Sequence, residues 1–118
     1  MRPLIISIVL GLTLATAPAR AEFFIKEYEK VKDSTAFKMY IEGVGIGYSW
    51  ANNAIEPKQY QLFCPPPTLE LQEKNYVNIL KRELAENKLW ISSATNYPLE
   101  LILLKGLQRT FPCKKTRP

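Results

Sequence analysis

The sequence predicts an all-α fold, a small single-domain bundle of about four helices held by one disulfide after an export signal. Three observations support this prediction. Apolar residues recur at helical spacing in four segments. Prolines and N-cap residues separate these segments, and the 118 residues include only two cysteines. A hydrophobic content of 47% is ordinary for a globular protein, and the length allows one domain.

Residues 1–21 have the pattern of a secretory signal peptide. Arg2 provides a positive start, Leu4–Ala17 is an uncharged and mostly apolar run, and Ala19-Arg20-Ala21 places small residues around a cleavage site. The apolar run has 14 residues, whereas a membrane-spanning helix needs roughly 20, so an uncleaved anchor is the less favoured alternative. We therefore expect a periplasmic mature domain over 22–118, with its core over 34–113.

Cleavage also changes the charge that a partner would meet. Without Arg2 and Arg20, 14 of the 16 basic residues remain against 11 acidic ones. A net charge of +3 does not indicate a nucleic-acid partner, and the one basic cluster is the tail at 114–117. We expect neither nucleic acid nor a membrane as a partner of the mature domain.

The segment Phe37–Ile55 decides the fold class because it fits two patterns. Apolar residues recur at alternating intervals of four and three over its whole length, which indicates a helix. Val44–Trp50 also alternates with glycine and serine as a strand would, and three glycines cost a helix roughly 3 kcal/mol. The longer pattern favours the helix. Its flank of Tyr40, Gly43 and Gly47 is expected to pack closely against another helix or a second subunit.

One helix is predicted on each side of this segment. Glu22–Lys32 has amphipathic spacing, and Asp33-Ser34-Thr35 offers N-cap oxygens to the helix that follows it. Thr68 is the expected N-cap of a helix that ends near Asn87 with a left-handed residue at Asn87 or Lys88. The inward face of that helix is expected to carry Leu69, Gln72, Tyr76, Leu80 and Leu84, flanked by Val77.

The last helix is predicted to begin at Pro98 and to end at Pro112. Its inward side chains are expected to be Leu99, Ile102, Leu103, Leu107 and Phe111. Glu56–Pro67 and Leu89–Tyr97 have no helical stripe and are predicted to be connectors.

The side chains needed for most enzyme classes are missing. The chain has no histidine, which removes the Ser-His-Asp triad, the Cys-His dyad and almost every zinc site. Cys64 and Cys113 are too few for a structural metal site, but in an exported protein they can form a disulfide. Glu70 and Glu83 lie off the apolar stripe of their predicted helix and are expected to be solvated. We predict a protein that is not an enzyme and has no cofactor or metal.

Aromatic residues in the two connectors are the candidates for contact with a protein partner. Interface hot spots are enriched in such side chains, although cover for the local core is the commoner role of a connector aromatic. The candidate contacts are Tyr60, Phe63, Trp90 and Tyr97.

The chain resembles the Rap/Tai family of immunity proteins, which protect bacteria against type VI secretion amidases. The resemblance covers about Phe37 to Cys113. It rests on Phe37-x-x-Tyr40-x-x-Gly43-Val44-x-x-Gly47, on Phe63-Cys64-Pro65-Pro66-Pro67 with Gln72, and on the closing Phe111-Pro112-Cys113.

The resemblance implies an all-α periplasmic protein that binds a peptidoglycan-cleaving amidase and blocks its active site through surface loops. It also implies a possible homodimer. The alternative is a general periplasmic protein-binding or stress-chaperone module without an amidase partner. A histidine-free chain lacks the residue that usually provides a pH switch near neutrality, which makes a pH-switched chaperone the less favoured alternative.

Overall fold

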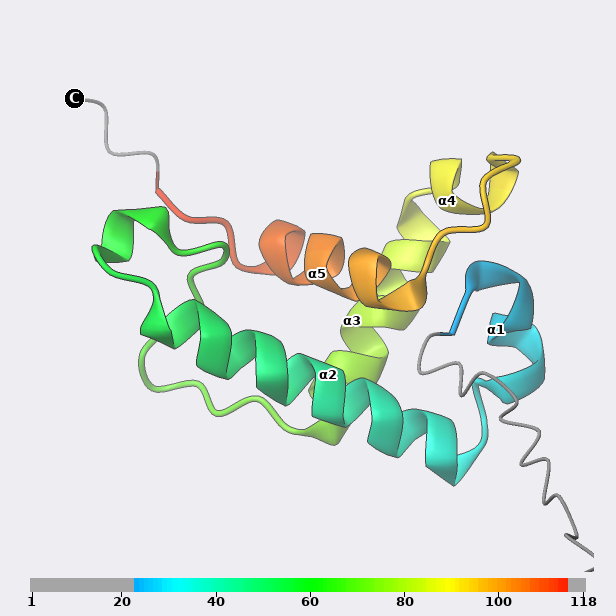
Figure 1. Cartoon of the computed structure of the whole chain (residues 1–118), viewed down its shortest axis with the longest axis horizontal. Helices are drawn as coiled ribbons and strands as arrows, with labels where there is room; N and C mark the ends of the chain where they lie inside the picture. The colour runs from blue at the N-terminus through cyan, green and yellow to red at the C-terminus, as the bar shows by residue number, and fades with distance from the viewer. Residues whose placement is uncertain (1–22, 115–118) are drawn as a thin grey trace, which may run out of the picture.

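The computed structural model describes residues 23–114 and is all-helical over that range (Figure 1). The predicted signal peptide at 1–21 and the basic tail beyond Lys114 lie outside the described residues. The helices are α1 (Ile25–Val31), α2 (Thr35–Ala54), α3 (Glu73–Glu86), α4 (Leu89–Ser92) and α5 (Leu99–Thr110), with a 3-10 turn at Lys58–Tyr60. The four predicted helices are present, and the predicted loop Leu89–Tyr97 contains the one-turn helix α4.

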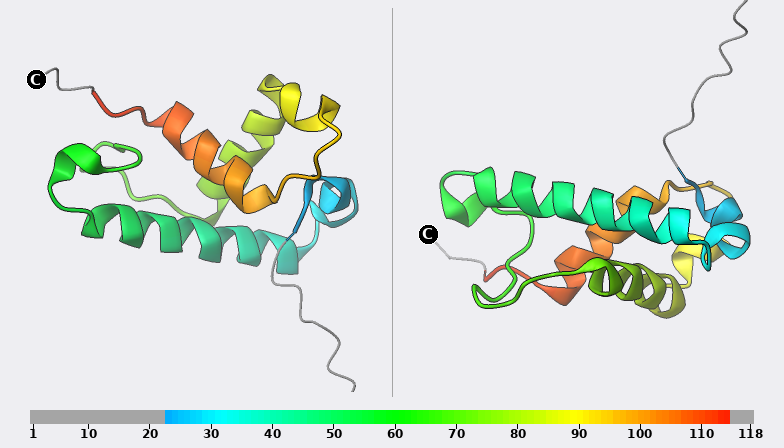
Figure 2. Two further views of the ribbon diagram at one scale, coloured as in Figure 1. Left: turned by 45° about the horizontal axis from the view of Figure 1, so that its top comes forward. Right: turned by 90° about the horizontal axis from the view of Figure 1, so that it is seen from below.

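Three helices enclose the core. α3 crosses behind α2 and α5 and contacts both, and α2 also contacts α5 (Figures 1 and 2). The side chains of the core are Phe37, Ile41, Phe63, Tyr76, Ile79, Leu80, Leu84, Leu99, Ile102, Leu103 and Leu107. The inward residues predicted for α5 are confirmed, with Phe111 partly buried at its end, but only part of the stripe predicted for α2 faces inward, since Ala51 is exposed.

The segment Phe37–Ile55 is helical, and the strand alternative is wrong. Ser34 caps α2, because its Oγ accepts a hydrogen bond from the N–H of Phe37 at 3.2 Å. Tyr40 packs against the core as expected. The prediction that Gly43 and Gly47 pack against another helix of this chain is wrong, because nothing lies within 4 Å of a Cβ built on either. Their packing against a second copy stays a prediction.

α3 begins later than predicted. Thr68 does not cap it, because Thr68 lies within a turn in which Leu69 donates its N–H to the carbonyl of Pro66 at 3.0 Å. The helix instead begins after Gln72, which forms a capping box with Asn75. Leu69 is consequently 44% exposed and not part of the inward face. The predicted left-handed residue at the end of the helix is also wrong, since no residue from Phe23 to Lys114, glycines included, has a positive φ.

The predicted disulfide is confirmed. Cys64 and Cys113 are bonded, with their Cα atoms 4.9 Å apart, which ties the connector after α2 to the end of α5. Cys64 also donates its N–H to the carbonyl of Phe111 at 2.8 Å. Asn52, which is buried in α2, holds the same connector: its Oδ1 accepts from the N–H of Leu62 at 2.7 Å, and its Nδ2 donates to the carbonyl of Phe63 at 2.7 Å.

The N-terminal segment docks beside the start of α5. Leu99 donates its N–H to the carbonyl of Phe23 at 2.8 Å, and Ile25 donates to the carbonyl of Tyr97 at 3.0 Å. The ring of Phe23 also meets that of Phe37 edge-on at 5.4 Å. α1 is thereby held near the first turns of α2 and opposite part of α3, as the view from below shows (Figure 2).

Candidate protein-binding surfaces

Phe63 is buried and does not project from the connector. Its side chain is 1% exposed and belongs to the core, because Asn52 fixes its backbone in the interior. Phe63 is therefore not the exposed connector residue that was expected, and a partner contact there stays a prediction. Tyr60, three residues earlier, is 64% exposed in the 3-10 turn and stays a candidate contact.

Trp90 and Tyr97 pack against each other and against the core. Their rings meet edge-on with centroids 5.1 Å apart, and both side chains are partly buried. The indole Nε1 of Trp90 donates to Oε1 of Glu83 at 2.9 Å. Trp90 and Tyr97 thus cover the local core, which was the alternative role expected for connector aromatics. Neither residue is as exposed as Tyr60 or Trp50.

Glu83 is buried, and the prediction that it is solvated is wrong. It is 3% exposed, and its Oε2 forms an ion pair with Nε of Arg109 at 3.0 Å. Glu83 lies seven residues after Tyr76, two helical turns along the same face of α3, so the spacing already placed it on the inward side. Gly106 of α5 lies opposite, where a Cβ would be 2.8 Å from Cγ2 of Ile79. The carboxylate is therefore part of the packing between α3 and α5.

The first candidate surface is centred on Trp50 of α2, and we name it the Trp50 surface. Trp50 is 73% exposed, and it shares a hollow of about 240 Å³ with Ile46 and Leu69, which are 40% and 44% exposed. The buried rings of Phe63 and Tyr76 also line the hollow. Sequence reasoning missed this surface because Trp50 continues the spacing of the flank formed by Tyr40, Gly43 and Gly47, which was expected to pack against another helix or a second subunit.

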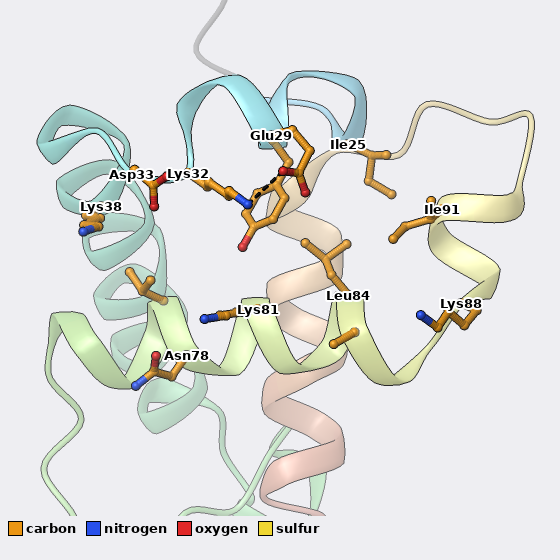
Figure 3. Close-up of a pocket in the computed structure, with 13 residues that line it drawn as sticks. Ile25, Glu29, Lys32, Asp33, Lys38, Asn78, Lys81, Leu84, Lys88 and Ile91 are labelled. Atoms are coloured by element: carbon orange, nitrogen blue, oxygen red, sulfur yellow. Dashed lines mark ion pairs between the residues drawn. The ribbon is translucent and has the colours of Figure 1, made fainter.

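The second candidate surface is a groove between α1 and α3, which we name the lysine groove (Figure 3). Its volume is about 530 Å³. Ile25 and Tyr28 of α1, Val77 and Leu84 of α3 and Ile91 of α4 contribute apolar lining. Burial raises the pKa of the Tyr28 hydroxyl above its usual value, and the nearby Lys32 partly opposes that shift. The charged lining residues are Glu29, Lys32, Asp33, Lys38, Lys81 and Lys88.

Only one of these four lysines is paired within the described part of the chain. Lys32 Nζ lies 2.8 Å from Oε2 of Glu29, and that hydrogen bond and charge raise the pKa of Lys32. Lys38, Lys81 and Lys88 form no ion pair with any residue from Phe23 to Lys114. The close-up shows Lys38 at one end of the groove, Lys81 near its middle and Lys88 at the other end (Figure 3).

Neither surface carries a metal-ligand set. Within the described range, no group of three or more Cys, Asp or Glu residues is placed to hold a metal ion. A search of the same range for a helix long and apolar enough to cross a membrane found none. What the two surfaces offer chemically is apolar contact area and, at the lysine groove, positive charge.

Comparisons of the chain with known protein families, with curated proteins and with solved structures found no match.

Proposed function

We propose that this chain is a periplasmic protein that acts by binding another protein stoichiometrically, without turnover. The observation that carries the proposal is the exposure of Trp50, 73% of whose side chain is accessible beside Ile46 and Leu69. Tryptophan is the residue type most typical of interface hot spots, and burial of a large aromatic against an apolar hollow is favourable. A partner that covered the Trp50 surface would remove this apolar area from water.

The frame that presents the Trp50 surface supports the same proposal. Trp50 is in the 20-residue helix α2, and Leu69 is in the connector that the Cys64–Cys113 disulfide and Asn52 anchor. A surface held in place before binding loses little conformational entropy when the partner arrives, which favours tight association. Tyr60 lies in the same connector and is exposed, so it would extend the contact if the partner reaches that turn.

The resemblance to the Rap/Tai family indicates the class of partner, and the signal-like residues 1–21 indicate the compartment. On these two grounds we propose an immunity protein. Its partner would be a peptidoglycan-cleaving amidase delivered by type VI secretion, and it would inhibit the amidase by covering its active site. The protein would supply contact area and shape, and none of its side chains would take part in a reaction.

Rescue of cells from a periplasmic amidase tests this function. Expression of the full chain should protect cells that export the cognate amidase, and deletion of residues 1–21 should abolish protection by leaving the protein in the wrong compartment. Trp50→Ala should weaken protection, whereas Met39→Ala should not. Met39 is the matched control because it is also exposed on α2, at 61%, and lines neither candidate surface.

Two results would contradict the proposal. One is protection by the chain lacking residues 1–21 that equals protection by the full chain. The other is a purified protein that binds no amidase and instead prevents unfolded proteins from aggregating, which would favour the general chaperone alternative.

A further inference from the structure

We propose that the lysine groove is a second binding site, and that its occupant is an acidic amphipathic segment of a protein. The inference rests on the proposed function because the occupant belongs to a bound protein. The site is nevertheless separate, since the lysine groove and the Trp50 surface share no lining residue. The groove involves α1, α3, α4 and the start of α2, whereas the Trp50 surface involves the second half of α2, the connector before α3 and Tyr76 in the first turns of α3.

The charges of the groove identify the sign of the occupant. Four lysines line it against two acidic residues, Glu29 and Asp33, and Lys32 is already paired with Glu29. Lys38, Lys81 and Lys88 are left without an acidic partner among the described residues. Electrostatic complementarity therefore favours an occupant with carboxylates that face these three ammonium groups.

The apolar lining identifies a second property of the occupant. Val77 and Leu84 on α3 face Ile25 and Tyr28 on α1, and Ile91, which is 61% exposed, forms part of the lining at α4. A small inorganic anion would gain nothing from these side chains. An occupant that gains from both features has apolar side chains toward the lining and acidic ones toward the lysines, as an amphipathic segment does.

The distribution of the lysines favours a peptide over a lipid. Lys38, Lys81 and Lys88 are spread along the groove from one end to the other (Figure 3). A fatty acid or a lipid headgroup concentrates its negative charge at one end, which would leave the other lysines unpaired. A peptide segment can carry several carboxylates along its length and match all three.

Binding of designed peptides tests this inference directly. The probe is a fluorescein-labelled peptide of about 14 residues, four helical turns, with leucine on one face and glutamate on the other. The comparison peptide has glutamine in place of every glutamate. In fluorescence anisotropy at low salt, the glutamate peptide should bind the mature protein at least about tenfold more tightly. That difference should shrink at about 1 M salt, where screening acts over roughly 3 Å.

Two variants assign the binding to the groove. Lys81→Glu should weaken binding of the glutamate peptide by about tenfold, because it replaces an attraction with a repulsion. Lys74→Glu is the matched control, since Lys74 is an exposed lysine of the same helix that does not line the groove. Ala85→Trp should also weaken binding by at least about tenfold. The Ala85 side chain is exposed and lines the groove, so the larger side chain fills the groove without disturbing the core.

Several results would overturn the inference. One is equal binding of the glutamate and glutamine peptides. Others are an effect of Lys81→Glu on peptide binding no larger than that of Lys74→Glu, and peptide binding that Ala85→Trp leaves unchanged. Lys81-dependent binding of phosphatidylglycerol vesicles with no binding of the glutamate peptide would make the groove a lipid site instead. None of these results affects protection by the Trp50 surface, so failure of this inference is distinguishable from failure of the proposed function.

Discussion

The ring of Tyr76 occupies the space where a side chain on Gly45 would begin. A Cβ built on Gly45 would lie 2.3 Å from Cδ1 of that ring, far inside van der Waals contact. Both residues are buried, so α2 and α3 can approach this closely only because position 45 has no side chain. The phenol of Tyr76 is held in place in turn, since its hydroxyl is 2.7 Å from Oγ of Ser49.

Gly45→Ala should therefore destabilise the protein by roughly 1–3 kcal/mol, because the Tyr76 ring must move out of a packed core. Gly47→Ala is the matched control on the same helix. Its Cβ would meet nothing within 4 Å, so it should raise stability by about 0.5–1 kcal/mol through helix propensity alone. Chemical denaturation measures both. If Gly45→Ala raised the free energy of unfolding as much as Gly47→Ala does, α2 and α3 would not meet at Gly45.

Reduction of the Cys64–Cys113 disulfide should lower stability substantially. The bond joins residues 49 apart in sequence, and closure of a loop of that size removes about 4 kcal/mol of unfolded-state entropy in the chain-entropy model. Thermal melts with and without a reductant should separate clearly, and Cys64→Ser/Cys113→Ser should melt with the reduced protein. If the oxidised and reduced forms melted together, the bond would not constrain the unfolded chain as proposed.

Arg109→Ala should destabilise the protein by about 1–3 kcal/mol because it leaves the buried Glu83 carboxylate without its cation. The cost is below that of a fully buried pair, since the Arg109 side chain is 57% exposed. Glu83→Gln should cost less, because a neutral amide can still accept from Trp90. In the double variant, Glu83→Gln should cancel part of the Arg109→Ala loss. Additive effects in denaturant titrations would rule out coupling between the two side chains.

Alkaline pH should destabilise the protein through its partly buried tyrosines. Burial raises the pKa of Tyr28 and of Tyr48 above the usual 10.0, and the negative charge of Glu100 adds to the effect at Tyr48. The unfolded chain then loses these protons first, so the stabilisation is complete below about pH 10 and is lost as pH rises through the folded pKa values. The free energy of unfolding should fall above about pH 10, and Tyr28→Phe/Tyr48→Phe should reduce that slope. An unchanged slope would contradict this origin.

The sequence predicts the helices well where one stripe dominates and poorly where two features compete. The stripe of α5 is long and regular, so its inward residues could be assigned from spacing. On α2, however, Gly43, Gly45 and Gly47 are equally small, and only the position of Tyr76 on another helix decides which one packs. No local pattern contains that information.

Two of the candidate contacts, Phe63 and Trp90, are covered for a similar reason. Phe63 is buried because Asn52, eleven residues earlier, holds its backbone, and Trp90 is covered because Glu83 accepts from its indole. Both bonds depend on how separate segments meet. Glu83 itself could have been found from its spacing of seven residues after Tyr76, but it was placed off the apolar stripe and was therefore expected to be solvated. The start of α3 was misplaced because Thr68 is a stronger cap by type than Gln72, and the turn from Pro66 to Leu69 outweighed that preference.

Calorimetric titration of the cognate amidase with the mature protein measures whether the Trp50 surface binds a protein partner. We expect a saturable complex of fixed stoichiometry. Trp50→Ala, whose exposed side chain contributes little to folding, should weaken binding by about 2 kcal/mol or more, whereas Met39→Ala should leave binding unchanged. If the two variants weakened binding equally, or if no complex formed, the protein would not bind its partner through the Trp50 surface.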